Sequence, residues 1–331
     1  MKYHITYILP AGREEYLYSQ YDFLRNNYGG EFIHLNKKDK ELQEEMRKLK
    51  KKNHINIAFW ADLTHIDIHT MFNKLDIKQI FIEHGCSPKR WFTYSPNTEI
   101  RLKTLRDFAQ LWPTNPMEEE EYKRGGRETE KKIKKVGYLK ALEYYRESTV
   151  NKNQIYLCPS YWADWGEMDL AVEILEHISP EYTCYVSLHP GAFSLYYDKL
   201  DRAFKENKNI ILLKKTEEKI EKLKSSETVI GSNGTPLTEG LYMKKKVIFI
   251  KGKDLSWEKI KLLELSSYLF APVLDDSVKM SHISELDVSL KNATYPGSAK
   301  NIFYKTNFSK EETIKIIDKA FSEFLKKRNG Q

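Results

Sequence analysis

The sequence predicts an α/β protein with two Rossmann-like domains, whose mainly parallel sheets face a central cleft. Short apolar runs alternate with helical stretches along the chain, and this spacing is typical of parallel sheets built from βαβ units. The runs form two sets on either side of a polar stretch at 147–153. The length of 331 residues also favours two domains.

Each set supplies six candidate strands. The first six cover 4–9, 31–35, 56–59, 79–82, 108–111 and 134–136. The second six cover 155–158, 183–188, 210–213, 228–230, 246–250 and 268–270. Helical patterns lie between them, for example at 168–177, where Leu170 and Ile174 share one face.

A helix is predicted at the end of the chain, over 310–327. Its apolar face carries Ile314, Ile317, Phe321 and Phe324. We therefore expect a first domain over 1–148, a second over 149–308, and a C-terminal helix over 309–331 that crosses back to the first domain.

Composition and charge exclude several classes of protein. Lysine and arginine number 54 and aspartate and glutamate 47, a net charge of +7, which suits phosphate-bearing substrates or an anionic membrane surface. This excess is slight and no nucleic-acid-binding motif is present, so we expect no nucleic-acid partner. No apolar stretch approaches the ~20 residues of a spanning helix or forms a signal peptide. We expect a cytoplasmic protein, with a peripheral position at the inner face of the plasma membrane as the alternative.

Metal and disulfide sites are not indicated. Cys86, Cys158 and Cys184 have no C-x-x-C spacing. The histidine pair His65 and His69 has helical i, i+4 spacing, but no third ligand is evident. We expect neither a metal nor a cofactor.

The segment 228–250 carries the most informative pattern, because two apolar runs flank a small-residue turn and a short helix. The turn consists of Gly231, Ser232, Asn233, Gly234 and Thr235. A helix N-terminus after a buried strand favours anions, through its unpaired N–H groups and its dipole. We expect these five residues to hold phosphate and Glu239, one helical turn further on, to hold a ribose. The alternative is an ordinary strand-to-helix turn.

Two histidines follow predicted strands, one in each domain. His84 comes directly after the strand 79–82 and is followed by Gly85, and His189 comes after the strand 183–188. The carboxyl edge of a parallel sheet is the usual place for ligands, and histidine can act as a base at neutral pH. We expect His84 to be a general base and His189 to stabilise a leaving phosphate. Structural histidines at strand ends are the alternative.

Cations and aromatic residues are mixed in the stretch KRWFTY at 89–94, just after the His84 loop and beginning with Lys89. Such a mixture suits a membrane interface or single-stranded nucleic acid. It equally suits the start of a helix packed on the domain.

The order of these motifs resembles the CDP-glycerol glycerophosphotransferase family of teichoic-acid and capsule synthesis, whose members have the two-domain GT-B fold. HGCSPK at 84–89 is similar to the family's HGTPLK loop, GYL at 137–139 to its GYP segment, and LHP at 188–190 to its LHP. The turn at 231–235 is loosely similar to its TDYSS segment. The resemblance covers 79–250 and rests on motif order, since Ser232, Asn233 and Gly234 stand where the family has Asp, Tyr and Ser.

The resemblance implies a transferase that moves glycerol phosphate, or a similar alditol phosphate, from a CDP-activated donor. The acceptor would be a hydroxyl on a lipid-linked saccharide or cell-surface polymer, and CMP would be released. The first domain would present this acceptor, with His84 as the base and Gly85 and Lys89 nearby; the second would bind the donor. A lipid-linked acceptor implies peripheral membrane contact. The alternatives are a GT-B glycosyltransferase that uses a nucleotide sugar and a non-enzymatic module that binds anionic ligands.

Overall fold

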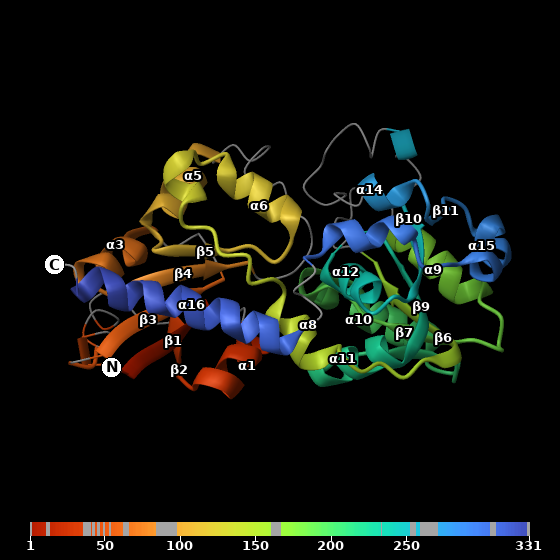
Figure 1. The fold of residues 1–331 in the computed structure, drawn as a ribbon. Coiled ribbons are helices and arrows are strands. Elements are labelled where there is room, and N and C mark those ends of the chain that lie inside the picture. Colours follow the sequence, from red (N-terminus) through yellow and green to blue (C-terminus); the bar gives the residue numbers. More distant parts are fainter. Residues whose placement is uncertain are drawn as a thin grey trace. The chain divides into compact units, whose positions relative to one another are not determined.

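The computed structural model describes residues 2–10, 14–35, 41, 44, 47–48, 50–52, 54–61, 66–83, 98–159, 167–232, 234–251, 256–258, 271–304 and 309–329 (Figure 1). The chain divides into two compact units. The described residues of the first fall within 1–86, 90–143 and 303–331, and those of the second within 144–302.

The first unit is built on a five-stranded parallel sheet in the order β2-β1-β3-β4-β5. Its strands are β1 (Lys2–Pro10), β2 (Glu31–Leu35), β3 (His54–Trp60), β4 (Lys78–Ile82) and β5 (Gln110–Trp112). Successive side chains of a strand point to opposite faces. In β1, Tyr7 and Leu9 enter one core and Ile8 enters the other. Burial on both faces explains the near-continuous apolar runs from which these strands were predicted.

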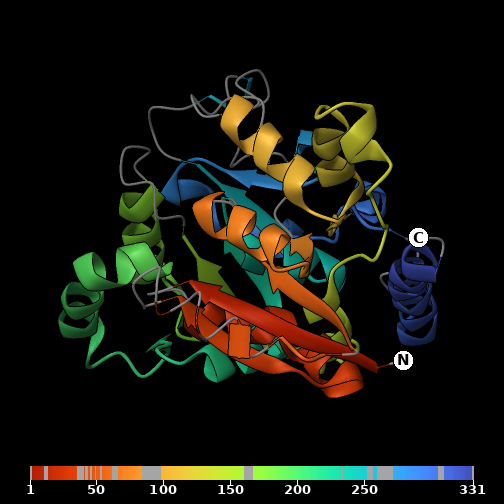
Figure 2. The same cartoon turned by 90° about the vertical axis from the view of Figure 1, so that its left-hand side faces the viewer.

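Helices pack on both faces of this sheet. They are α1 (Glu14–Tyr28), α3 (Ile66–Lys74), α5 (Thr98–Asp107), α6 (Pro116–Lys123), α7 (Arg127–Glu130) and α16 (Lys310–Asn329), with α8 (Leu139–Tyr144) at the boundary with the second unit. α16 buries Ile317, Phe321 and Phe324 in the core that contains Tyr7, as its apolar pattern predicted. The ring of Phe321 lies 5.1 Å from that of Tyr3 in β1 and 5.9 Å from that of Trp112 in β5, so α16 lies across the strands on one face of the sheet (Figures 1 and 2).

The strand predicted over 134–136 is wrong. The segment makes an isolated parallel bridge between Ile133 and Leu111, and the Lys134 N–H donates to the Leu111 carbonyl at 2.9 Å. Val136 is fully buried although it lies in a loop, so its apolar character reflects core packing without a strand.

The second unit is built on a six-stranded parallel sheet in the order β11-β10-β9-β6-β7-β8. Its strands are β6 (Asn151–Cys158), β7 (Thr183–Val186), β8 (Ile210–Leu212), β9 (Ser226–Gly231), β10 (Lys246–Ile250) and β11 (Val278–Met280). β6 begins within the polar stretch 147–153. The first three residues of this strand are exposed, which explains their polar character. The strand predicted over 268–270 lies outside the described residues.

The helices of the second unit are α9 (Glu167–His177), α10 (Pro190–Phe204), α11 (Thr216–Ser225), α12 (Thr235–Tyr242), α14 (Ala271–Leu274) and α15 (Leu286–Asn292), with 3-10 helices η2 (Ile283–Glu285) and η3 (Gly297–Ile302). α9 buries Leu170 and Ile174 against Ile155 and Leu157 of β6. No helix among the described segments of either unit combines the length and apolar character needed to cross a membrane.

Candidate functional site

The sheet of the second unit reverses its strand order between β6 and β9. β6 is the first strand of the unit; the chain then adds β7 and β8 on one side and β9, β10 and β11 on the other. Such a switch point leaves a crevice at the carboxyl ends of the two strands, where open α/β sheets bind ligands. β6 ends at Cys158 and β9 at Gly231, and these two residues are partners in the sheet. The turn singled out in the sequence therefore starts at the switch point.

The start of the turn is fixed by close packing against β6. A Cβ atom on Gly231 would lie 2.8 Å from Cys158 Sγ and 2.9 Å from the Cys158 carbonyl oxygen. The Cys158 thiol also donates to the Ile230 carbonyl at 3.4 Å. Only glycine leaves room for this approach, so the chain enters the turn at a defined position.

The rest of the turn exposes a helix N-terminus. Gly234 is the N-cap of α12 and has φ +105°, a conformation that favours glycine. Gly234 has no side chain with which to cap the helix, Pro236 carries no N–H, and the first turn of α12 contains no acidic residue. The positive end of the helix dipole is therefore open to an anion here. Ser232, the second residue of the turn, is fully buried beside the end of β9.

Glu239 is a buried carboxylate on α12. Its side chain is only 2% exposed, and the Tyr145 hydroxyl donates to its Oε2 at 2.8 Å. A Cβ atom on the adjacent Gly240 would lie 2.8 Å from Val229 Cγ2, so α12 lies directly against β9. This close approach places the carboxylate on a backbone that is held firmly by the sheet.

Further buried polar groups adjoin Glu239. Burial raises the pKa of the Tyr156 hydroxyl far above its ordinary value; a hydrogen bond with the Ser187 side chain opposes this, and the nearby Cys158 and Glu239 add to it. Tyr156 lies on β6, and Ser187 directly follows β7. Sequence reasoning missed Tyr145 and Tyr156, because contacts such as Tyr145–Glu239 join residues 94 positions apart.

His189 lies at the same edge of the sheet as the turn. It follows β7 and is exposed, and its carbonyl accepts the Phe193 N–H at 3.0 Å at the start of α10. β7 and β9 both pair with β6, so two strand spacings, about 10 Å, separate them.

Four of the predicted site residues lie outside the described residues: His84, Gly85, Lys89 and Asn233. The structure describes the approach to His84, since β4 ends at Ile82 and the following Glu83 is buried. β4 therefore ends at the residue that the sequence predicted, and only Glu83 separates this end from His84.

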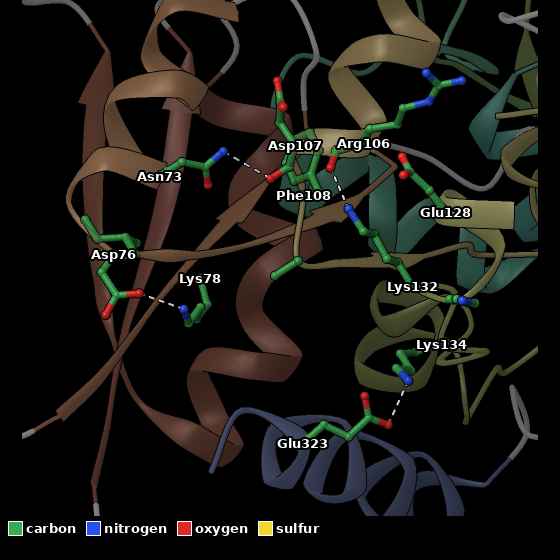
Figure 3. Close-up of a pocket in the computed structure, with 13 residues that line it drawn as sticks. Asn73, Asp76, Lys78, Arg106, Asp107, Phe108, Glu128, Lys132, Lys134 and Glu323 are labelled. Atoms are coloured by element: carbon green, nitrogen blue, oxygen red, sulfur yellow. Dashed lines mark hydrogen bonds and ion pairs between the residues drawn. The ribbon is translucent and has the colours of Figure 1, made fainter. Parts of the chain in front are cut away.

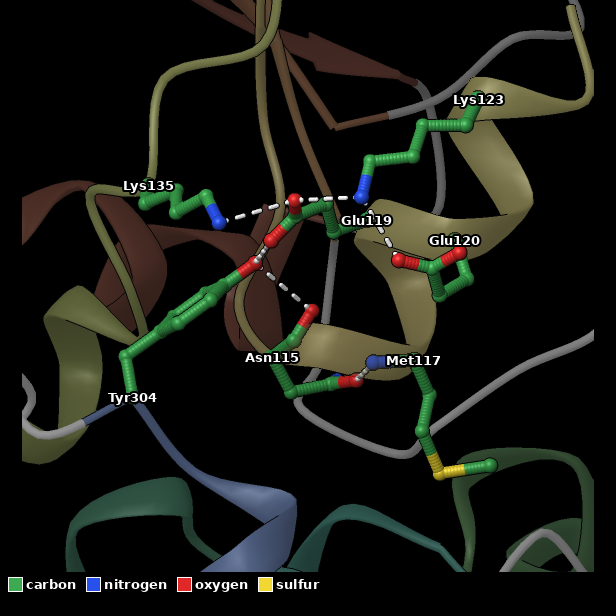
Figure 4. Close-up of polar contacts among 7 residues, drawn as sticks. All are labelled: Asn115, Met117, Glu119, Glu120, Lys123, Lys135 and Tyr304. Atoms are coloured by element: carbon green, nitrogen blue, oxygen red, sulfur yellow. Dashed lines mark hydrogen bonds and ion pairs between the residues drawn. The ribbon is translucent and has the colours of Figure 1, made fainter. Parts of the chain in front are cut away.

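A buried polar cluster close to this edge joins the C-terminal part of the chain to α6 (Figure 4). The Tyr304 hydroxyl donates to Glu119 Oε2 at 3.0 Å, and the ammonium groups of Lys123 and Lys135 lie 2.8 and 2.9 Å from Glu119 Oε1. Asn115 caps α6, because its Oδ1 accepts the N–H groups of residues 117 and 118 at 3.0 Å. α6 thus has a capped N-terminus, in contrast to α12.

Metal ligation is not supported by the described residues. No group of three or more His, Cys, Asp or Glu among them is placed to hold an ion. His69 is fully buried, its Nδ1 lies 3.0 Å from Gln79 Oε1, and its ring packs 4.2 Å from that of Trp60. His69 is therefore a core residue of the first unit, and His65 lies outside the described residues.

A pocket of 640 Å³ opens in the first unit beside the amino ends of β4 and β5 (Figure 3). Its charges are largely engaged within the chain: Lys78 pairs with Asp76 at 2.6 Å and Lys134 with Glu323 at 2.7 Å. Parallel sheets bind ligands at the opposite, carboxyl edge. We therefore do not assign the main chemistry to this pocket.

Comparison with known proteins finds similar solved structures but no similar sequences. No family model and no curated protein matches the sequence. A variant of the wall teichoic acid polymerase TagF, soaked with CDPG, superposes with a TM-score of 0.67 at 13% identity, over 97% of this chain and 89% of that one.

Two structures of sugar-nucleotide epimerases are also similar. UDP-GlcNAc 2-epimerase from Methanocaldococcus jannaschii, in complex with UDP-GlcNAc and UDP, has a TM-score of 0.57 at 17% identity, covering 96% of this chain and 99% of that one. A putative UDP-N-acetylglucosamine 2-epimerase from Listeria monocytogenes has a TM-score of 0.64 at 12% identity, covering 98% and 97%. At such identities the likeness establishes the fold: the chain has the two-unit α/β GT-B architecture that the sequence predicted.

Proposed function

We propose that this protein is a transferase that binds a nucleotide-activated donor at the Gly231–Thr235 turn of its second unit. The observation that carries the proposal is the open N-terminus of α12 at the switch point between β6 and β9. Backbone amides and the helix dipole at such a position stabilise phosphate. The structural neighbours support this, since the TagF variant was soaked with CDPG and the epimerase is in complex with UDP-GlcNAc and UDP.

The donor is held by two kinds of contact in this proposal. Its phosphates lie against the turn formed by Gly231, Ser232, Asn233, Gly234 and Thr235. Its ribose hydroxyls donate to the Glu239 carboxylate, a charge-assisted contact that is stronger than a neutral hydrogen bond. His189, exposed at the neighbouring strand end, donates to the phosphate on which charge builds as the leaving group departs.

The first unit presents the acceptor. His84 takes the proton of the acceptor hydroxyl, and that oxygen attacks the β-phosphorus of a CDP-alditol. The bond between the β-phosphorus and the bridging oxygen breaks, CMP leaves, and the product is a phosphodiester. Gly85 and Lys89 lie beside the acceptor, which is a lipid-linked or polymeric saccharide. An enzyme that acts on a lipid-linked acceptor would contact the membrane surface peripherally, from the cytoplasmic side.

The second candidate function is glycosyl transfer from a nucleotide sugar, which the fold likeness to the UDP-GlcNAc 2-epimerases favours. The donor site would be the same, but the acceptor would attack the anomeric carbon and a nucleoside diphosphate would leave. Release of CMP from CDP-glycerol selects the first function, and release of UDP from a UDP-sugar selects the second. A non-enzymatic binding module would release neither.

Histidine variants test the division of roles between the two units. His84→Ala should leave donor binding nearly intact and lower turnover by at least ~10²-fold, because a general base acts on the chemical step. His189→Ala should damage donor binding and turnover together, because it touches a phosphate before and during the reaction. TagF structures include variants with single histidines replaced by asparagine or alanine.

The measurement combines titration calorimetry with CDP-glycerol and the rate of CMP release. The pH–rate profile should show an ionisation near the histidine pKa that disappears in the His84 variant. A fully active His84→Ala enzyme would assign the base to another acceptor-side residue. Loss of binding in both variants would contradict the division of roles.

A further inference from the structure

Tyr145 makes a buried contact that reaches the proposed ribose-binding carboxylate. The residue follows α8, close after the boundary at which the second unit begins. Its hydroxyl donates to Glu239 Oε2 at 2.8 Å. Both residues are almost completely buried, at 3% and 2% exposure. The two lie 94 positions apart in the sequence, so the contact depends on the tertiary fold.

The physical effect of this hydrogen bond is to hold one charged group in one orientation. The backbone of Glu239 is already fixed, because the adjacent Gly240 lets α12 lie directly against Val229 of β9. The remaining freedom is in the side-chain torsions of Glu239. A hydrogen bond to an ionised acceptor is short and strong, and an ionised carboxylate is retained in a buried site only when such bonds compensate its lost hydration.

We propose that Tyr145 is a positioning residue for the nucleotide donor, which acts by orienting the Glu239 carboxylate toward the ribose. The inference rests on the proposed function, because it takes Glu239 as the ribose acceptor. Tyr145 itself does not touch the donor. Its hydroxyl holds Oε2, so that the carboxylate meets the two ribose hydroxyls without first having to reorient. Preorganisation of this kind raises affinity by removing the cost of ordering the site upon binding.

The test compares nucleotides with and without ribose hydroxyls within each protein variant. Titration calorimetry gives the dissociation constants of CDP and UDP and of their 2′,3′-dideoxy forms, and the ratio of the two constants measures the contribution of the hydroxyls. The ratio cancels any general loss of stability in a variant. For the unaltered protein we expect a ratio of about 10–150, the range for hydrogen bonds to a charged group.

Tyr145→Phe should lower this ratio at least about fivefold, by removing the hydroxyl that orients the carboxylate. Glu239→Gln should lower the ratio to the few-fold that neutral hydrogen bonds to the amide oxygen contribute. The double variant should match Glu239→Gln alone, because Tyr145 acts only through Glu239. The matched control is Tyr304→Phe, which removes a buried tyrosine hydroxyl from the Glu119 carboxylate of the first unit and should leave the ratio unchanged.

The possible outcomes separate the inference from the function on which it rests. A ratio that falls in Glu239→Gln but not in Tyr145→Phe would make Tyr145 purely structural and leave the donor site intact. A ratio of one in the unaltered protein would remove the role of Glu239, and the absence of nucleotide binding would remove the proposed function; either result overturns the inference as well. If Tyr145→Phe does not fold, 3-fluorotyrosine at position 145 keeps the shape of the side chain and makes its hydroxyl a stronger hydrogen-bond donor to Glu239. The ratio should then rise, and an unchanged ratio would overturn the inference.

Discussion

At the scale of single residues, two glycines determine the shape of the candidate donor site, each for a different reason. Gly231 leaves room for Cys158 of the neighbouring strand, and Gly234 adopts the left-handed conformation that starts α12. The sequence pattern GSNGT indicated a phosphate-binding turn, but it did not reveal which glycine packs and which one turns. That distinction depends on β6, which lies about 70 positions earlier and pairs with β9 in the sheet.

Gly231→Ala should destabilise the second unit by roughly 1–3 kcal/mol, the usual cost of overpacking. The added methyl group would lie 2.9 Å from the Cys158 carbonyl oxygen, and a strand backbone cannot move away at little cost. Urea unfolding measures the difference. The control is Gly297→Ala, where the nearest atom to the new Cβ lies 3.7 Å away. Equal stability of the two variants would contradict the packing argument.

At the scale of elements, α6 and the segment that leads into α16 are joined through one carboxylate. Burial alone would raise the pKa of Glu119, but hydrogen bonds from Lys123, Lys135 and Tyr304 outweigh it and hold the pKa below its ordinary 4.5. A carboxylate with a depressed folded-state pKa stabilises the protein above the pKa of the unfolded chain. This stabilisation is lost as the pH falls from 4.5 through the lower, folded-state value.

Glu119→Gln should therefore reduce the free energy of unfolding by roughly 1–3 kcal/mol at neutral pH, and by progressively less below pH 4.5. Denaturant unfolding at several pH values measures this dependence. Glu120→Gln is the matched control, because Glu120 also pairs with Lys123, at 2.7 Å, but is 69% exposed; it should change stability by less than about 1 kcal/mol. A pH-independent loss in Glu119→Gln would show that packing, not charge, holds the cluster.

Elements with a clear apolar pattern were the most predictable from the sequence. β2 and β10 have the bounds that their apolar runs indicated, and α16 starts at the predicted residue. Two features of the fold were predicted wrongly or missed. β11 reads Val-Lys-Met, with a lysine at its centre, and so has no continuous apolar run. Val136 is buried in a loop, where its apolar character suggested a strand. The Tyr145–Glu239 contact could not be predicted, since local periodicity carries no information about partners so distant in sequence.

At the scale of the whole molecule, the two units have different strand orders but share one feature that positions a ligand site. Each parallel sheet has its first strand inside the sheet, so each has a switch point: between β1 and β3 in the first unit and between β6 and β9 in the second. The order of motifs along the sequence was sufficient to predict this architecture. It was not sufficient to choose a donor, because GSNGT at 231–235 is identical to the family's TDYSS segment at none of its five positions.

The central claim is that a nucleotide donor binds at the turn that opens α12. The most direct measurement is calorimetric titration of CDP and CDP-glycerol into three proteins: the unaltered chain, Gly234→Ala and Gly126→Ala. Both glycines are helix N-caps with positive φ, +105° for Gly234 and +88° for Gly126 of the first unit, so both substitutions strain the backbone in the same way. We predict binding to the unaltered chain and to Gly126→Ala, and at least about tenfold weaker binding to Gly234→Ala, because a shift of the turn misaligns its amides with the phosphates. Equal binding to all three proteins, or no binding to the unaltered chain, would contradict the account.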